Sequence, residues 1–414
     1  MQLIISSIRG YSHCDTQLNS RTKNALIGCL SCVLLLLLQG CAAPTERNAS
    51  IHSELMNPLD TSGLRFWDEY RSETENYNVV LELEALIENK QISDEVNHLA
   101  LSGGGVNGAF SAGILNAWSE QGTRPDFDVV TGVSTGAIVA VFAYLGAEYD
   151  TELKHYYTQT PVSDMFRRNS LITLLSRNAF VDTTGFERKV RKAIDSKMME
   201  RLSIERQKGR ILLIGTTNLD NQKMALWDIG RIAQVNTSEA QALIQNIVIA
   251  SSSIPGAFPA KVIPLSYQGE TYDELHVDGG ISRQVFLIPQ WINKSIKTSA
   301  RAQNIYVIRN GSLKPRFNQV ESGISSVSAS SIATLIRRQG VGDVEYIYHY
   351  SERNGYPFNL AHIDDDFVNY ELDPLSLDYM NAVYEYGFNK MKDNALWLAH
   401  PPSIPSPSNT VHHP

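Results

Sequence analysis

The chain contains 414 residues, 43% of them hydrophobic, and can bury a large core in one α/β domain or in several smaller ones. Its formal net charge of −8 becomes more negative if the first 40 residues are removed, which argues against nucleic acid as a partner. All four cysteines lie within the first 41 residues, so the rest of the chain cannot build a disulfide framework or a cysteine-ligated metal site.

Residues 1–40 have the pattern of an export signal. Arg21 and Lys23 precede an apolar run over residues 25–38, which matches the hydrophobic core of a signal peptide and is short for a membrane span. The run ends in Leu38-Gln39-Gly40-Cys41, which resembles a bacterial lipobox. That resemblance implies cleavage before Cys41 and lipidation of its thiol, and an uncut N-terminal anchor is the alternative. Either form attaches the protein to a membrane.

The residue after the expected lipidated cysteine is Ala42. In lipoproteins that this signal resembles, an aspartate there favours retention in the inner membrane. Alanine therefore predicts a lipid-anchored protein of the cell envelope that passes to an outer membrane if the host has one, held by the acyl chains on Cys41. Residues 41–60 are polar and predict a flexible tether. Residues 61–95 suggest a helical N-terminal extension.

From residue 96 onward, the pattern becomes that of an α/β domain. It predicts a buried strand over residues 99–101, then a glycine loop and a helix over residues 109–118. A second strand over residues 127–131 leads into a serine turn and a helix over residues 137–145. This order is typical of a mostly parallel sheet whose loops gather at the carboxyl ends of the strands.

The downstream segments extend the same domain. They predict a hairpin, a buried helix, two strands and a last helix, over residues 210–229, 240–250, 275–277, 304–308 and 377–397 in that order. Because nothing between residues 96 and 398 has the composition of a linker, we predict one domain over 96–398. Residues 399–414 are rich in proline and serine and predict a disordered tail.

The serine turn is Gly132-Val133-Ser134-Thr135-Gly136. A G-x-S-x-G segment between a strand and a helix places the serine on a sharp turn with its Oγ exposed. Glycine and serine are also common in structural turns, so the interpretation depends on the flanking strand and helix. In that context the segment predicts Ser134 as the nucleophile of a serine acyl hydrolase.

The glycine loop over residues 102–108 precedes the serine turn closely. Glycine lets the backbone approach a substrate, so we predict that the amides of Gly103, Gly104 and Gly105 stabilise an oxyanion. The loop partly satisfies the dinucleotide pattern G-x-G-x-x-G, but no acidic residue ends the next strand, where a ribose ligand should lie. In an α/β-hydrolase the two motifs would lie farther apart. The spacing favours adjacent strands whose loops meet over one pocket.

Together these motifs resemble the patatin-like phospholipase family. The glycine loop, the serine turn and Asp278-Gly279-Gly280 occur in the order and with the approximate spacing of that family, and residues 250–259 resemble its serine-rich segment. The resemblance covers roughly residues 97–289. It implies a three-layer α/β/α domain with a mostly parallel central sheet, in which Ser134 and Asp278 form a catalytic dyad that hydrolyses lipid acyl esters without a metal or cofactor. The motif glycines would support this site: Gly108, Gly132, Gly136, Gly279 and Gly280.

One position departs from the family pattern, because Asn107 lies where members often carry a basic residue. The change puts a contact with a lipid phosphate in doubt but leaves the amide donors. A dyad also raises a question of basicity, since an aspartate with an ordinary pKa near 4 is a weak base for a serine hydroxyl. The apolar neighbours Leu275, Val277 and Ile281 suggest that burial raises the pKa of Asp278.

Histidines provide an alternative to the dyad. A Ser-His-Asp triad would need a histidine after the acid, and His349 and His362 satisfy that order. His276 could share the face of Asp278 on its strand. A structural role is the more usual one for each of the three.

The run Asp364-Asp365-Asp366 lacks the glycine-spaced pattern of a calcium loop, and we interpret it as a solvated acidic turn. The sequence therefore predicts a membrane-tethered lipid acyl hydrolase of the phospholipase A or lysophospholipase type, acting on lipid or phospholipid with no metal. A Ser-His-Asp esterase and a non-catalytic, lipid-binding envelope lipoprotein are the alternatives.

Overall fold

The computed structural model describes residues 47–52, 55–69, 95–168, 181–287, 302–368 and 372–405. These residues all lie in one of the two compact units into which the chain divides, Arg47–Asn169 together with Ala179–Pro414. The predicted export signal and Cys41 lie outside the described residues, as do most of the predicted helical extension and the end of the predicted tail.

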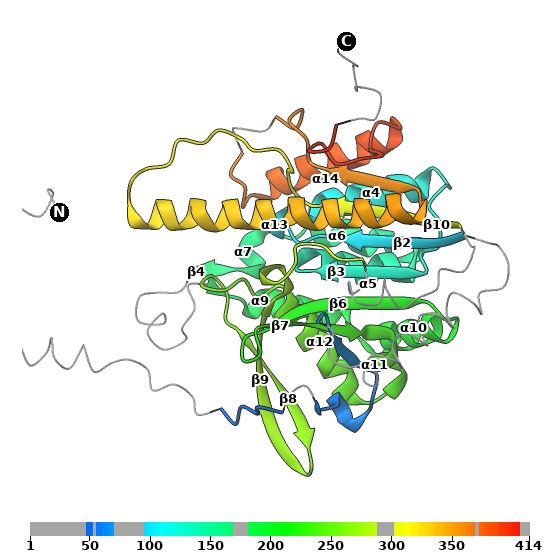
Figure 1. Ribbon diagram of the computed structural model, residues 1–414, viewed down its shortest axis with the longest axis vertical. Helices are drawn as coiled ribbons and strands as arrows, with labels where there is room; N and C mark the ends of the chain where they lie inside the picture. The colour runs from blue at the N-terminus through cyan, green and yellow to red at the C-terminus, as the bar shows by residue number, and fades with distance from the viewer. Residues whose placement is uncertain are drawn as a thin grey trace, which may run out of the picture. The chain divides into compact units, whose positions relative to one another are not determined.

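A sheet of nine described strands forms the centre of this unit (Figure 1). Its order is β1 (Arg65–Trp67), β7 (Lys223–Asp228), β6 (Ile211–Asn218), β3 (Val129–Val133), β2 (Glu95–Leu101), β10 (Ala302–Arg309) and β11 (Phe358–His362). The five strands from β6 to β11 are parallel to one another. The exceptions include β7 and β9 (Glu270–Asp278), each antiparallel to β6, and β8 (Lys261–Tyr267), which forms a hairpin with β9. This mostly parallel sheet confirms the predicted α/β fold class.

Hydrophobic side chains project from both faces of the sheet, because the side chains of successive residues in a strand point in opposite directions. In β6, Leu212 and Ile214 belong to one cluster of buried side chains, whereas Ile211 and Leu213 belong to another. A parallel sheet that is apolar on both faces must be covered on both faces by other elements. The domain therefore has three layers, with helices on either side of the sheet.

Four helices contribute most of the first cluster: α4 (Gly108–Glu120), α5 (Thr135–Leu145), α12 (Ser238–Ser251) and α14 (Leu377–Lys392). The long helix α13 (Ile324–Asn354) contributes Val341, Val344 and Ile347 to the second cluster. Only its C-terminal half covers the sheet. In Figure 1 the yellow N-terminal half of α13 extends past the ends of β2 and β3.

Shorter elements complete the described fold. They are the helices α6 (Asp150–Thr158), α7 (Val162–Met165), α9 (Thr184–Ala193), α10 (Ser196–Gln207) and α11 (Ile229–Val235), the strand pair β4 (Arg167–Arg168) and β5 (Val181–Asp182), and the 3-10 turns η3 (Pro58–Asp60), η4 (Gly105–Asn107), η5 (Ala147–Tyr149) and η6 (Gly279–Ile281). Side-chain caps fix the start of several helices. Thr237 accepts from the Ala240 amide at the start of α12, and Ser376 from the Tyr379 amide at the start of α14.

The segments that flank the predicted catalytic domain differ from expectation. The Asn48 carbonyl accepts a hydrogen bond from the Asp273 amide at 2.9 Å, so the described end of the predicted tether packs on β9. Residues 65–67 form strand β1 rather than a helix, because pairing with β7 satisfies backbone groups at the edge of the sheet. Ser403, in the predicted tail, donates to Glu345 of α13 at 2.6 Å. The domain therefore includes residues on both sides of its predicted bounds.

Candidate active site

Ser134 occupies the tight turn between β3 and α5, and its backbone conformation is unusual. Its φ of 57° and ψ of −129° lie outside the regions that L-residues usually adopt, which is typical of a nucleophile elbow. The flanking glycines make this turn possible. A Cβ on Gly132 would overlap the Gly136 carbonyl oxygen, and a Cβ on Gly136 would overlap that of Leu101. The side chain of Ser134 is buried at the floor of a pocket.

The serine-rich segment after α12 holds the elbow in place. The Ser134 amide donates to Ser251 Oγ at 2.9 Å, and Ser251 Oγ donates in turn to the Gly215 carbonyl of β6 at 2.8 Å. The Ser253 carbonyl accepts from the Asp278 amide at 2.9 Å. One segment of the chain therefore positions the backbone at both predicted catalytic residues.

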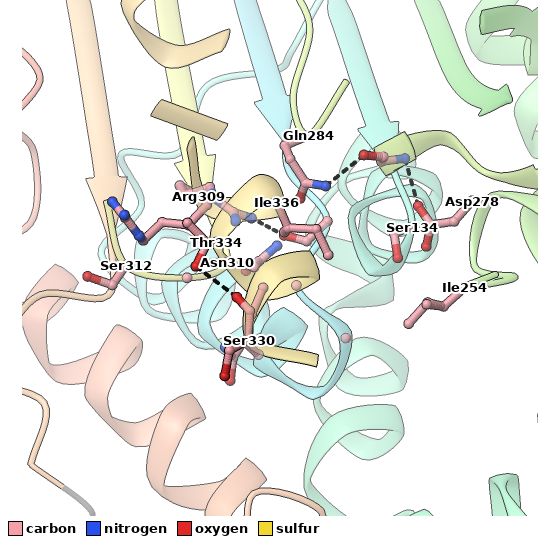
Figure 2. A pocket seen from close by; sticks show the side chains of 18 of the residues that line it. Ser134, Ile254, Asp278, Gln284, Arg309, Asn310, Ser312, Ser330, Thr334 and Ile336 are labelled. Atoms are coloured by element: carbon pink, nitrogen blue, oxygen red, sulfur yellow. Dashed lines mark hydrogen bonds between the residues drawn. The ribbon is translucent and has the colours of Figure 1, made fainter. Parts of the chain in front are cut away.

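The register of the sheet explains why Asp278 lies beside Ser134. Strand β3 pairs with the first half of β6 and ends at Val133, opposite Gly215. Strand β9 pairs with the second half of β6 along the same edge and ends at Asp278, opposite Thr216. The ends of β3 and β9 thus meet at consecutive residues of β6. Figure 2 shows the side chains of Ser134 and Asp278 next to each other at this junction.

The Asp278 carboxyl group is buried, and burial raises its pKa to about 6. Hydrogen bonds from the Ser134 side chain and from the Gly280 amide oppose that rise, and the Gly280 contact is 2.7 Å long. At neutral pH the group is therefore mostly ionised but much more basic than an ordinary aspartate. Gly280 must be glycine here, since a Cβ would lie 2.9 Å from Asp278 Oδ1 and 2.7 Å from Gln284 Nε2.

Of the three amides predicted as oxyanion donors, two are free to face a substrate in the described structure. The Gly103 amide donates to the Gln284 carbonyl at 3.0 Å, so it is not available to a substrate, contrary to the prediction. In the described part of the chain, the Gly104 and Gly105 amides have no such acceptor, and both residues line the pocket with Ser134. Gly105 has a φ of 57°, which favours glycine.

Two residues at the end of β10, Arg309 and the following Asn310, hold the glycine loop through their side chains. Arg309 Nη1 donates to the Gly103 carbonyl at 2.5 Å and to Ser102 Oγ at 3.0 Å. Asn310 Nδ2 donates to the Ser102 carbonyl at 2.9 Å. Burial lowers the pKa of Arg309 to about 10, and the charge of Asp343 opposes that change. The guanidinium therefore remains charged at neutral pH and acts as a rigid support for the loop.

The remaining motif glycines allow close backbone approaches. A Cβ on Gly108 would overlap the hydroxyls of Thr135 and Tyr157, where α4 crosses the start of α5. A Cβ on Gly279 would overlap the Gly215 carbonyl of β6. These positions therefore keep the glycine loop, the serine turn and the end of β9 within reach of one another.

A pocket of about 670 Å³ opens above Ser134 and Asp278, which is within the usual size range of small-molecule binding sites. Ile254, Pro255 and Ile281 give it an apolar wall next to the serine. The opposite part is lined by Arg309, Asn310 and residues of α13, and Figure 2 shows Ser330 and Thr334 on that side. The pocket therefore combines an apolar region at the serine with a polar region farther away.

The candidate histidines do not join this site. His349 is exposed on α13 beside Glu352, and the His362 Nδ1 contacts the Ile363 carbonyl. The ring nitrogens of His276 contact Thr216 and Glu274, and burial lowers its pKa. No histidine is among the residues that line the pocket within the described ranges. The geometry does not assemble a Ser-His-Asp triad.

The acidic run forms ion pairs with basic side chains. Asp364 contacts Lys314 at 2.8 Å, Asp365 contacts Arg316 at 3.4 Å, and Asp366 contacts Lys390. Asn107, the departure from the family pattern, lines the pocket and accepts a hydrogen bond from the Tyr379 hydroxyl at 3.0 Å. The acidic run thus lies in a charged surface turn, as predicted.

The sequence did not predict the residues that support the site from other parts of the chain. Gln284 holds the Gly103 amide through its carbonyl and the Gly280 carbonyl through its side chain, and its own amide donates to Asp343 at 2.7 Å. Gln284 and Arg309 carry no motif of their own. Only Ser251 had a signal, since it belongs to the serine-rich segment that the family resemblance includes.

A nucleophile elbow facing a buried carboxylate at the ends of neighbouring strands defines an acyl-hydrolase type of site on an α/β fold. Residues 99–289 match the family model of patatin-like phospholipases, which spans every predicted site residue except Cys41. This part of the chain is a patatin-like phospholipase domain, the domain of a family of lipid acyl hydrolases. No curated protein matches the sequence.

Solved structures with some similarity include VipD from Legionella pneumophila, with 11% identity and a TM-score of 0.35 over 73% of this chain and 67% of that one. Human GIVD cytosolic phospholipase A2 has 11% identity and a TM-score of 0.27 over 78% and 55%. The type III effector protein ExoU has 12% identity and a TM-score of 0.26 over 73% and 53%. This chain thus spans only about half the length of the last two.

Proposed function

We propose that the protein cleaves acyl esters of membrane lipids, as a phospholipase A or lysophospholipase, through a Ser134–Asp278 dyad. Asp278 accepts the hydroxyl proton as Ser134 Oγ attacks the ester carbonyl. The Gly104 and Gly105 amides stabilise the oxyanion. The alcohol leaves with the proton from Asp278, and water activated by the same carboxylate then hydrolyses the acyl-enzyme. Atoms and protons balance without a metal or cofactor.

The observation that carries this proposal is the meeting of β3 and β9 on one edge of β6. At this junction Ser134 lies on a strained turn beside a carboxylate whose pKa is raised to about 6. An acid with that pKa is a competent base near neutral pH. The apolar wall beside Ser134 supports an acyl chain as the group that binds there.

A fluorophosphonate probe tests the nucleophile. The full chain should be labelled covalently, Ser134→Ala should not be, and Ser330→Ala should be labelled like the wild type because Ser330 lines the same pocket away from Asp278. A wild-type protein that stays unlabelled but binds lipid would support the non-catalytic alternative. Assays on phospholipid, lysophospholipid and short-chain ester would then define the substrate.

We also propose that the protein is tethered to the outer membrane of a host that has one, through acyl chains on Cys41. The support is the lipobox-like sequence, which lies outside the described residues. In the described part of the chain, no helix has the length and apolar character needed to cross a bilayer. Cys41→Ser should abolish incorporation of labelled fatty acid and leave an uncut precursor. A wild-type protein that takes up no label and fractionates with soluble proteins would contradict the tether.

A further inference from the structure

The N-terminal half of α13 presents large apolar side chains to solvent. Ile324 is 89% exposed, Ile332 55% and Leu335 69%. These three residues recur at helical spacing and share one side of the helix. A helix of a folded domain normally buries such a side. Here it is the outward side, and the sheet is covered by the other half of α13.

The opposite side of the same helical segment faces the candidate active site. Ser330, Ala333, Thr334, Ile336 and Arg337 line the pocket that contains Ser134. Apart from Ile336, these residues are small, polar or basic, so most of the polarity of the segment is the reverse of that of a core helix. The orientation cannot be explained by packing within the described domain, because the apolar side has nothing there to cover it.

The loop before α13 enlarges this apolar surface. Phe317 is 96% exposed and Val320 is 41% exposed, and Val320 also lines the pocket. We use the name "outer face" for the six apolar residues Phe317, Val320, Ile324, Val327, Ile332 and Leu335. The outer face is therefore continuous with the rim of the pocket.

Charge distinguishes this segment from the rest of the protein. The chain carries a net charge of −8, yet residues 317–342, which include the outer face, contain the two basic residues Arg337 and Arg338 and a single acidic residue, Glu321. An apolar helix face flanked by arginines is the pattern of a segment that lies in the interface of a bilayer, with guanidinium groups near the phosphates. A second protein chain on this face would lie against the rim of the pocket and obstruct it. A lipid surface there would supply substrate to it.

We propose that the outer face docks on a phospholipid surface, so that a lipid leaves the bilayer and enters the pocket along α13. The conclusion that the surface is a phospholipid bilayer rests on the proposed function, whereas the docking itself can be tested without catalysis. This contact is distinct from the tether on Cys41. The tether keeps the protein near a membrane, and the outer face orients the pocket toward it.

A local fluorescence probe tests the docking. The full chain carries Ser134→Ala, serine in place of the four native cysteines, and an environment-sensitive dye on Leu335→Cys. Vesicles of phosphatidylcholine and phosphatidylglycerol should shift the dye emission to shorter wavelength. The matched control carries the dye on Val262→Cys, on β8, which is 43% exposed, and should not respond.

Three outcomes would overturn the proposal. In the first, the dye at position 335 fails to respond to vesicles. In the second, the dyes at both positions respond equally, which indicates adsorption through another segment. In the third, the dye at position 335 responds to protein concentration without vesicles, which indicates that a second copy of the chain occupies the face. Each is read without turnover, so failure of the proposed function leaves this result intact.

Activity provides a second measurement. Ile332→Asp with Leu335→Asp should reduce hydrolysis of vesicle phospholipid by roughly tenfold or more, because two charges oppose insertion. Hydrolysis of a soluble short-chain ester should stay within about twofold, since neither side chain lines the pocket. Val262→Asp should change neither rate. Equal loss on both substrates would contradict a role confined to docking.

Discussion

In the proposed dyad, Asp278 acts on Ser134 without a histidine between them, so the protonation state of Asp278 would set the pH range of activity. Burial raises the pKa of this carboxyl group to about 6. Only the ionised form accepts the serine proton. We therefore expect kcat/KM for an uncharged ester to rise with pH through about 6 and to level off above it. A rate that stays constant from pH 5 to pH 8 would contradict a carboxylate base.

The two side chains should also behave as one unit in mutagenesis. Ser134→Ala and Asp278→Ala are each expected to reduce kcat by about 10³-fold or more, and the double variant should be little worse than either single variant. Kinetics on a single soluble ester would measure this. His362→Ala and His349→Ala serve as controls. Near-full activity of Asp278→Ala, combined with loss in a histidine variant, would favour a triad instead.

Local motifs predict the two residues of the proposed dyad, but not the groups that hold them. Ser134 and Asp278 each lie in a short segment whose glycines are required by close backbone contacts, so sequence alone reveals them. Whether a loop amide is free depends on a partner far along the chain. The Gly103 amide is taken by Gln284, and nothing near either residue signals that contact.

At the scale of elements, β1 is joined to β9 by a buried ion pair across β7 and β6. Arg65 Nη1 lies 2.5 Å from Glu274 Oε2, with both side chains 2% exposed. Glu274 also contacts His276 Nε2 at 2.9 Å. Burial opposes ionisation of Glu274, but the charge of Arg65 and the contact with His276 lower its pKa overall. Glu274 and His276 lie shortly before Asp278 on strand β9.

Removal of one partner of this ion pair should therefore lower the stability of the fold. Arg65→Ala is expected to lower the free energy of unfolding by about 3–5 kcal/mol, because Glu274 is left as an uncompensated buried charge. Denaturant unfolding would measure the loss. Arg65→Met with Glu274→Gln removes both charges and should recover most of it. If the double variant is as unstable as the single one, packing rather than charge accounts for the effect.

Element prediction succeeded where periodicity was strong and failed where it was not. The apolar segments of β6, α12 and α14 were identified because their side chains pack into the core. Strand β1 has three residues, and only its partner β7 makes it a strand. The first half of α13 is rich in serine and turns its apolar side outward, so no core-facing pattern marks it.

For the whole molecule, the raised pKa of Asp278 lowers stability at neutral pH, and the proposed mechanism requires that raised pKa. The pKa is about 6 in the folded protein and near 3.9 in an unfolded chain. The folded state therefore holds the proton more tightly, and its stability falls as the pH rises from about 4 past 6. The Asp278→Asn variant has no ionisable group at this position, so its stability does not fall with pH for this reason.

We expect Asp278→Asn to be more stable than the wild type at pH 8 by up to about 3 kcal/mol, with a much smaller difference at pH 4. Thermal unfolding at the two pH values would measure it. Burial also raises the pKa of Asp343 to about 6, but that residue is common to both proteins and cancels in the comparison. A stability difference that does not depend on pH would indicate that ionisation of Asp278 is not its cause.

The position of β1 has a consequence for how the chain folds. This strand is made early in synthesis, yet its hydrogen-bonding partner is β7, which follows long after it in the sequence. Until β7 emerges, β1 has no edge to join, and the loop that their pairing closes is long, which slows its formation. A strand that remains unpaired is accessible to other proteins of the cell in that interval. The order of synthesis thus leaves β1 without its partner until the strands that precede β7 have been made.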